Sequence, residues 1–447
     1  MEATTRRFGR RELIRLIAPM LVEQILLVTV GIFATIMVAN AGESAVSGVS
    51  LVEAINMLAL NLFSSLAAGG AIVAGQYLGK DEKPNAKHAA RQLVVSITLL
   101  AAATSAVCLL LNRQILSFFY GQIEPDVMRS ARDYFYFSAM SFPFIALFNA
   151  AAALFRGMNK SGVSMLNALI MNVINVAGNV AFIHYMHLGA MGAGLATLAA
   201  RAVAAVSMLW MLRNPDLAIS VRSYSPRGLD GKMIRRILKI GVPGSLENCS
   251  FMLGRIILTS LIATMGTTAI AANAVGFSVA TFAVAPGMAM GMAMMAVIAQ
   301  CVGANEYEQA HCYIKYLLTF AFVIMIVANG AILAFNGPIL SLYKTSAETT
   351  RLAWYTVLLH SGAAVTIWPL AFTLSNAFRA AGDVRFPMAV SIFSMFVFRI
   401  GCSYLLENLF GLGVLSVWIA MLIDWAVRAV FFTWRWRSGR WRRFQVI

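Results

Sequence analysis

The sequence contains little charge for its length. Asp, Glu, Lys and Arg make up 12% of its 447 residues, whereas a soluble domain carries about 25%. Hydrophobic residues make up 60% of the chain, and the mean hydropathy is +0.76. One soluble core cannot absorb so many apolar residues, so the composition predicts a polytopic membrane protein.

Cysteine is also scarce, and the sequence lacks the motifs of metal or nucleotide chemistry. The five cysteines are scattered without metal-ligand spacing, which excludes the usual kind of zinc site. His184 and His187 are one helical turn apart but have no evident third ligand. No glycine-rich nucleotide loop and no cluster of His, Asp and Glu occurs. We therefore expect no enzyme, no catalytic residues, no metal site and no cofactor.

The net charge of +16 does not indicate a nucleic acid partner, because of where the positive residues lie. They gather between alternate apolar runs, as in the cytoplasmic loops of membrane proteins. The opposite segments, 41–44 and 266–268, contain no Lys or Arg. We expect a multi-pass protein of the prokaryotic plasma (inner) membrane, surrounded by lipid, with both termini cytoplasmic. The basic segments are 6–11, 80–91, 156–160, 213–236, 379–385 and 435–443.

Twelve apolar runs are long enough to cross the hydrocarbon layer, which takes about 20 residues. Backbone groups in lipid must be satisfied internally, so the runs should be helices. We expect an N-terminal six-helix lobe (1–212), a basic cytoplasmic linker (213–236) and a C-terminal six-helix lobe with a basic tail (237–447). The runs are 13–38, 46–77, 92–112, 132–155, 162–185, 190–212, 237–264, 269–301, 312–335, 352–378, 386–407 and 412–434.

The two halves repeat one another at a constant shift of 224 residues. The shift carries Pro19 onto Pro243 (243 − 19) and Gln76 onto Gln300, which indicates a duplicated unit. Six spans per unit give both halves the same orientation. The predicted fold is therefore an all-α membrane protein of two six-helix bundles, related by a pseudo-twofold axis along the membrane normal. Such a repeat is typical of transporters with a site between their halves.

Two acids fall near the middle of their predicted spans. Glu23 and Glu247 each follow the repeated proline by one helical turn. Proline frees a backbone carbonyl one turn back, and a carboxylate beside it suits Na⁺ or H⁺ as a coupling cation. The alternative is that each acid pairs with a buried arginine such as Arg255, Arg201 or Arg399. No other mid-span acid is identified in the first half.

Two further pairs of polar residues are one helical turn apart. Asn175 and Asn179 share a helix face, where their oxygens suit Na⁺, although hydrogen bonds between helices are the commoner use. Asp424 and Arg428 have the spacing of an ion pair on one helix. We interpret this second pair as structural.

A methionine-rich stretch in the eighth span is a candidate lining for a substrate cavity. Met288 and Met292 belong to it, and methionine adapts to varied apolar shapes. Close packing of helices through small residues is the alternative role of this stretch. Gln24, Asn248 and Arg255 are the polar candidates for the same cavity.

The repeated segments resemble those of the multidrug and toxic compound extrusion (MATE) family over essentially the full length. The resemblance rests on the paired Pro-x-x-x-Glu-(Gln/Asn) motifs, the segment 42–50, the Gln-x-x-Gly motifs at 76 and 300, the segments 155–157 and 378–383, and the segment 413–428. It implies two six-helix lobes around a V-shaped cavity. It also implies an antiporter that exports small drug-like organic compounds, often cationic, in exchange for Na⁺ or H⁺ by alternating access. We expect a monomer.

The chain departs from the family pattern at the cation site of the N-terminal lobe. Asn175 and Thr197 match the residues that the resemblance implies, but Ala34 and Asn179 stand where acids are usual. A site of amide and hydroxyl oxygens without a carboxylate should bind Na⁺ weakly and cannot exchange a proton. We therefore predict that Glu23 and Glu247 carry the coupling.

A second hypothesis keeps the fold and changes the cargo. Related exporters flip lipid-linked saccharides, and such transporters tend to use basic cavities. Arg255, Arg201 and Arg399 leave this alternative open.

Overall fold

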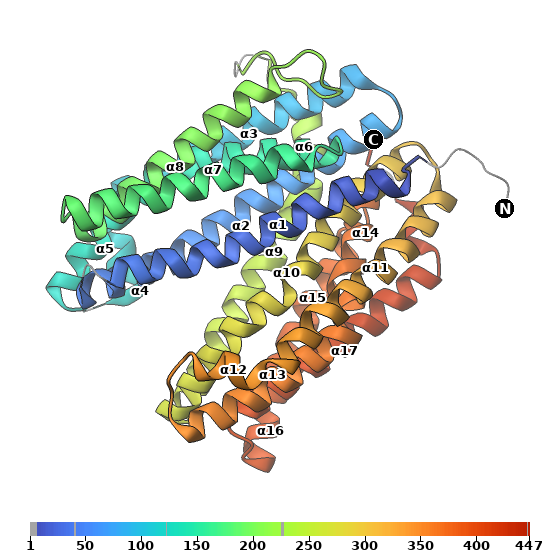
Figure 1. The fold of residues 1–447 in the computed structure, drawn as a ribbon. Coiled ribbons are helices and arrows are strands. Elements are labelled where there is room, and N and C mark those ends of the chain that lie inside the picture. The colour runs from blue at the N-terminus through green and yellow to red at the C-terminus, as the bar shows by residue number, and fades with distance from the viewer. Residues whose placement is uncertain (1–6, 40–41, 122, 225–227, 445) are drawn as a thin grey trace. The chain divides into compact units, whose positions relative to one another are not determined.

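The computed structural model describes residues 7–39, 42–121, 123–224, 228–444 and 446–447, with side chains 30–36, 38 and 39 outside the description. Regular structure in these ranges is helical (Figure 1). The chain forms two compact units. The N-terminal unit is Phe8–Ser245 with Ile447, and the C-terminal unit is Leu246–Val446 with Arg7.

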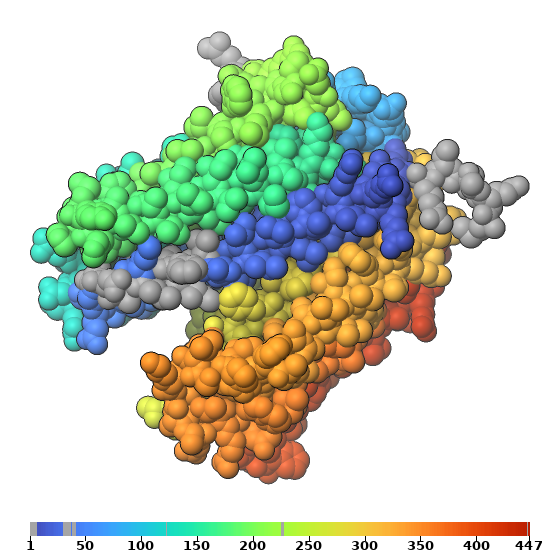
Figure 2. Space-filling model, viewed as in Figure 1, coloured from blue at the N-terminus to red at the C-terminus, as the bar shows by residue number. Residues whose placement is uncertain are grey.

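The helices of the N-terminal unit follow the six predicted spans of the first half. Figure 1 shows α7 and α8 side by side in green. Figure 2 shows the face on which α1 (blue) lies beside α7. The elements are α1 (Arg10–Ala39), α2 (Glu43–Gly79), α3 (Lys83–Leu110), α4 (Asn112–Tyr120), α5 (Pro125–Met140), α6 (Phe142–Gly157), α7 (Ser161–Asn179), the π-helix η1 (Val180–Tyr185) and α8 (Gly189–Leu212).

The C-terminal unit repeats this order with the helices that follow α9, whose first residues belong to the N-terminal unit. Its elements are α9 (Gly231–Ala263), α10 (Thr267–Gly303), α11 (Tyr307–Ala334), α12 (Asn336–Ser341), α13 (Ala347–Thr366), η2 (Pro369–Thr373), α14 (Leu374–Ala381), α15 (Arg385–Ser394), η3 (Met395–Gly401), α16 (Cys402–Phe410), α17 (Val414–Arg437) and η4 (Arg440–Arg443).

Each predicted span corresponds to a helix, a bent pair of helices or a helix with a π segment. Among the described residues, nine helices are long and apolar enough to cross a membrane, or up to eleven if each of two bent pairs counts as one span. α1, with 30 residues, is a further long helix and matches the span 13–38. The all-α membrane fold is thus confirmed.

Two spans expected to be continuous are bent. The span 132–155 bends by 45° between α5 and α6, and the span 352–378 bends by 60° between α13 and η2. Pro143 and Pro369 lie in the first turns after these breaks. Proline lacks the amide hydrogen that would continue the ladder and its ring clashes with the preceding turn, which accounts for both bends.

Apolar side chains cover much of the outer surface of both units. Leu110 is 79% exposed, Val206 62% and Val327 68%. Apolar surface of this extent on long helices matches a hydrocarbon surround. The protein is therefore a multi-pass membrane protein.

The predicted linker ends earlier than residue 236, because α9 begins at Gly231. Asp230 forms the start of this helix, since its Oδ1 accepts from the backbone N–H groups of Lys232 at 2.9 Å and Met233 at 3.3 Å. Its Oδ2 lies 3.1 Å from Nε2 of His88 on α3. The segment before α9 is thus attached to the N-terminal unit.

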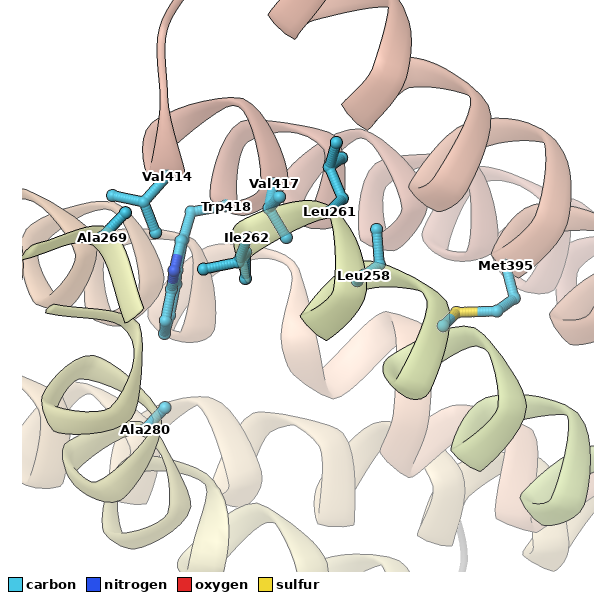
Figure 3. Close-up of a cluster of buried hydrophobic side chains, with 9 residues drawn as sticks. All are labelled: Leu258, Leu261, Ile262, Ala269, Ala280, Met395, Val414, Val417 and Trp418. Carbon is cyan, nitrogen blue, oxygen red and sulfur yellow. The ribbon is translucent and has the colours of Figure 1, made fainter. Parts of the chain in front are cut away.

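Apolar packing in the C-terminal unit surrounds Trp418. The indole lies beside Ile262 of α9, in a cluster that also contains Leu258 and Leu261 of the same helix (Figure 3). Its Nε1 donates to Oδ1 of Asn273 at 3.2 Å. Trp418 therefore connects α17 to both α9 and α10, with its polar atom satisfied.

Candidate functional site

Glu23 is buried in the N-terminal unit and has partners for both carboxylate oxygens. It is 3% exposed. Nη1 of Arg156 donates to Oε1 at 2.9 Å, and Oγ of Ser164 donates to Oε2 at 3.0 Å. Because the three residues lie on α1, α6 and α7, the acid joins three helices.

Glu247 has a comparable partner in the C-terminal unit. Nη2 of Arg379 lies 2.8 Å from Oε1 and 2.7 Å from Oε2 of this acid. Nη1 of Arg379 donates to Oδ1 of Asn376 at 2.8 Å, which orients the guanidinium. Both repeat-related acids are therefore bound to an arginine from their own unit. Arginine keeps its charge at physiological pH, so neither pair needs an external cation for charge balance.

The alternative that each acid pairs with an arginine agrees with the structure, but the arginines named as examples are not the partners. Arg255 is exposed on α9, with its guanidinium 4.0 Å from the ring centroid of Phe277. Arg201 donates to Oγ of Ser141 at 2.8 Å, and Arg399 contacts an acid of its own unit that is described below. The partners in the structure, Arg156 and Arg379, belong to basic segments that the sequence predicts to be cytoplasmic loops. The helices extend beyond the apolar runs, so both arginines lie in the last turns of α6 and α14.

The structure brings together the three residues predicted for the cation site of the N-terminal unit. Nδ2 of Asn175 donates to Oγ1 of Thr197 at 3.3 Å, and Nδ2 of Asn179 donates to Oδ1 of Asn175 at 3.1 Å. Oδ1 of Asn179 is buried and has no hydrogen-bond partner among the residues described. Ala34, the other position noted there, has a side chain outside the described residues.

The N-terminal unit contains a further acid that is not among the candidates predicted from the sequence. Glu53 lies on α2, and its Oε1 accepts from the hydroxyl of Tyr134 at 2.5 Å and from Nδ2 of Asn56 at 3.0 Å. The first half therefore does have a second acid within its spans. The criterion that selected Glu23, an acid inside an apolar run, would have found it.

Asp424 and Arg428 form an ion pair at 2.8 Å in the C-terminal unit. Oδ2 of Asp424 also lies 3.1 Å from Nε of Arg399. Oγ of Ser394 donates to Oδ1 of the same acid at 2.5 Å. All three charged residues are buried. The cluster joins α17 to α15 and η3, which fits a structural role.

The methionine stretch divides between two faces of α10. Met288 is 52% exposed and Met292 is half-buried, one turn away, whereas Met290 and Met294 are fully buried. Met290 and Met294 therefore pack inside the unit, whereas Met288 and Met292 lie at or near its surface.

The remaining candidates are less informative. Gln24 and Asn248 are half-buried in separate units, and their assignment to a substrate cavity stays a prediction. Within the described ranges, no group of three or more His, Cys, Asp or Glu residues could hold a metal ion. His184 and His187 lie at and just beyond the end of η1.

Comparison with known proteins places both repeats in one family. The MatE family model matches residues 19–181 and 243–405, again at the shift of 224 residues. The chain is 24% identical to the uncharacterized transporter YisQ of Bacillus subtilis, covering 95% of this chain and 93% of that protein. It is 21% identical to the probable multidrug resistance protein NorM of Thermotoga maritima, covering 98% and 94%.

Solved structures show the same fold. A crystal structure of a MATE in complex with MaL6 superimposes with a TM-score of 0.90 at 21% identity, covering 97% of each chain. The family model spans well over half of the sequence, in two matches that contain both acid motifs. The chain therefore belongs to the MatE family of multidrug efflux transporters.

Proposed function

We propose that this protein is a secondary antiporter that exports small organic compounds, cationic or amphipathic, in exchange for Na⁺ or H⁺. It would act as a monomer in a prokaryotic plasma membrane, with both termini in the cytoplasm and no enzymatic step. The family supports the transport class, and relatives described as probable multidrug resistance proteins support drug-like cargo.

The positions of Glu23 and Glu247, one acid in each unit one turn after the repeated proline, support cation coupling most directly. Arg156 and Arg379 are their present partners. Each unit carries one acid at the repeat-related position, held by one positive group that another cation could replace. In a site of low dielectric, breaking such a pair is costly unless a substitute charge arrives. Cation binding at these acids would therefore favour a conformation in which the arginines are released.

Alternating access then requires only a difference in affinity. A coupling cation that binds one conformer better than the other shifts the equilibrium between them. An organic cation competing for the same carboxylates would make exchange obligatory. In this proposal Asn175, Asn179 and Thr197 supply further oxygen atoms within the N-terminal unit.

Reconstituted vesicles test this proposal with ethidium as the organic cation. Proton and sodium gradients are imposed separately on wild type, Glu23→Gln and Glu247→Gln, with the exposed Glu348→Gln as the control. We expect one gradient to drive ethidium in wild type and the control, and both Glu23→Gln and Glu247→Gln to lose that drive. Wild-type transport by both of these variants would defeat the coupling role.

A lipid-linked saccharide as cargo is the less favoured alternative. The three arginines that suggested a basic cavity already bind other groups, namely Phe277, Ser141 and Asp424. Relatives named for multidrug resistance also favour the extruder.

A further inference from the structure

The last turns of α17 lead from an exposed apolar face to a group of arginines. Val430 and Phe431 are exposed, and each precedes the exposed Trp434 by one helical turn on the same face. Exposed apolar side chains on a long membrane helix face hydrocarbon, and tryptophan gathers where hydrocarbon meets the lipid headgroups. Arg437 is exposed one turn further along. This face of α17 therefore places the headgroup level between Trp434 and Arg437.

Beyond α17 the chain turns back toward Trp434. Gly439 has a φ of +67°, in the left-handed region that favours glycine after the end of a helix. The 3-10 helix η4 follows, and the guanidinium of its first residue, Arg440, lies 5.1 Å from the centroid of the Trp434 ring. A tryptophan ring attracts a cation held over its face. The turn thus returns a positive group to the exposed face of α17.

The short helix η4 is held in place by its buried tryptophan. Trp441 is fully buried, and its ring centroid lies 6.2 Å from that of Tyr307 on α11. Residues three apart in a 3-10 helix share a face, so the exposed Arg440 and Arg443 lie together on the opposite side from Trp441. We call Arg437, Arg440 and Arg443 the arginine patch.

The acids that contact this segment are already bound to other arginines. Oδ2 of Asp383 accepts from Nε of Arg435 at 2.8 Å, and Oε1 of Glu308 accepts from Nη1 of Arg442 at 2.5 Å. Among the residues that the structure describes, no carboxylate lies within ion-pair distance of the arginine patch. Three positive charges therefore remain without a counter-charge.

The segment is also attached to the helix that carries Arg379. The short helix η4 packs against α14. A Cβ at Gly382, the residue after α14, would lie 2.5 Å from Cγ2 of Val446, so the chain beyond η4 packs tightly on this position. Arg379 of α14 binds Glu247. A ligand on the arginine patch would therefore stabilise the folded segment against the end of α14.

An anionic phospholipid fits both parts of this surface. Guanidinium groups bind phosphate oxygens with strong, charge-assisted hydrogen bonds, and anionic headgroups attract basic residues that lie just beyond a membrane span. The acyl chains of the same molecule can lie on the exposed apolar face of α17. Inorganic phosphate would use only the charges, and a zwitterionic lipid would bring no net negative charge to three arginines.

We propose that the arginine patch and Trp434 form a binding site for the headgroup of an anionic phospholipid, whose acyl chains lie along Val430 and Phe431. Trp434 is a positioning residue, because its ring holds Arg440 at the headgroup level. The inference goes beyond the proposed antiport and holds whatever compound is exported.

Titration of the full chain in detergent tests the charges. Phosphatidylglycerol is compared with phosphatidylcholine, bound lipid is counted by native mass spectrometry, and thermal unfolding is followed in parallel. The patch variant is Arg437→Gln/Arg440→Gln/Arg443→Gln. One arginine near an anionic lipid surface strengthens binding about fivefold, so the patch variant should bind phosphatidylglycerol about 100-fold more weakly than wild type. Phosphatidylglycerol should raise the unfolding temperature of wild type and not that of the patch variant.

The matched control removes three exposed arginines of the N-terminal unit, Arg113→Gln/Arg129→Gln/Arg132→Gln, and should bind like wild type. Equal affinity of the patch variant and this control for phosphatidylglycerol would overturn the site. Equal binding of both lipids by wild type would do the same. Inorganic phosphate that raised the unfolding temperature of wild type as much as phosphatidylglycerol would show an anion site without a lipid, and would also reject the proposal.

Trp434→Leu tests the positioning role while every charge is kept. Loss of the aromatic face should weaken phosphatidylglycerol binding about two- to fivefold, and Trp434→Phe should restore most of it. Trp210→Leu, at an exposed tryptophan of α8, is the control and should change nothing. Wild-type affinity in Trp434→Leu would contradict the role of Trp434.

Discussion

Arg156 and Ser164 together satisfy both oxygens of Glu23, at 2.9 and 3.0 Å, in a site that is 3% exposed to solvent. The Glu23 carboxylate therefore depends on Arg156 to compensate its charge. Removing one member of a buried pair leaves a charge without compensation, whereas removing an exposed charge changes little.

Arg156→Gln should therefore lower stability strongly. Loss of one partner of a buried ion pair costs about 3–5 kcal/mol, because the Glu23 carboxylate is left buried with Ser164 alone. Thermal unfolding of the detergent-solubilised protein measures the effect, with the exposed Arg129→Gln as the control. Equal unfolding temperatures for the two variants would show that the pair contributes little.

Asp424→Asn should lower the stability of the protein at least as much as Arg156→Gln does. Arg428 and Arg399 have side chains that are 3% and 8% exposed, and both depend on this one acid. Substitution would leave two buried guanidinium groups without a counter-charge, again at a cost of about 3–5 kcal/mol. The comparison variant is the exposed Glu348→Gln. A melting temperature of Asp424→Asn within error of that control would refute the structural role.

Gly194→Ala should disturb the position of Tyr134. A Cβ at Gly194 would lie 2.9 Å from Cβ of Phe137 and 3.3 Å from the carbonyl oxygen of Tyr134, so α5 and α8 must separate. We expect a loss of about 1–3 kcal/mol, as for overpacking in a core. Gly162→Ala on α7, where a Cβ meets nothing within 4 Å, is the matched control and should unfold no earlier than wild type. Equal stability of the two would contradict close packing at Gly194.

Asp230 should make stability pH-dependent at the start of α9. The hydrogen bond with His88, and then that with the Met233 N–H, lower the pKa of Asp230 below its ordinary value of 3.8. A lowered folded-state pKa contributes stability above the ordinary value, and that contribution is lost as the pH falls through the folded-state pKa.

Asp230→Asn should therefore unfold slightly earlier than wild type at neutral pH, and the difference should vanish in acid below the folded-state pKa. The effect is small because 38% of the Asp230 side chain is accessible to solvent, which screens the interaction. Unfolding temperatures measured across this range test it. A difference that grows on acidification would have the wrong sign.

The fold could be predicted from the sequence because hydropathy is a local signal and because the two halves repeat at a constant shift. Runs such as 190–212 and 412–434 match α8 (Gly189–Leu212) and α17 (Val414–Arg437) within a few residues. The bends before Pro143 and Pro369 were missed, since proline in a long apolar run does not by itself say how far the helix axis turns.

The candidate site was predicted less well because its partners lie far apart in sequence. Glu23 was selected correctly as a buried acid, but Arg156 is 133 residues away and was counted as a loop charge. Glu53 was overlooked although it lies inside a predicted span, and its contact with Tyr134 joins residues 81 positions apart. Helical spacing predicts which residues share a face, as for Asn175 and Asn179, but not which neighbouring helix that face meets.

The most direct test follows ethidium and the coupling cation in the same vesicles. With either an acidic or a sodium-loaded lumen, we predict that one of the two gradients drives ethidium inward while the luminal cation leaves in proportion, and that both movements stop in Glu23→Gln and in Glu247→Gln. Accumulation of ethidium at an unchanged rate after an ionophore has collapsed that gradient would contradict cation-coupled export.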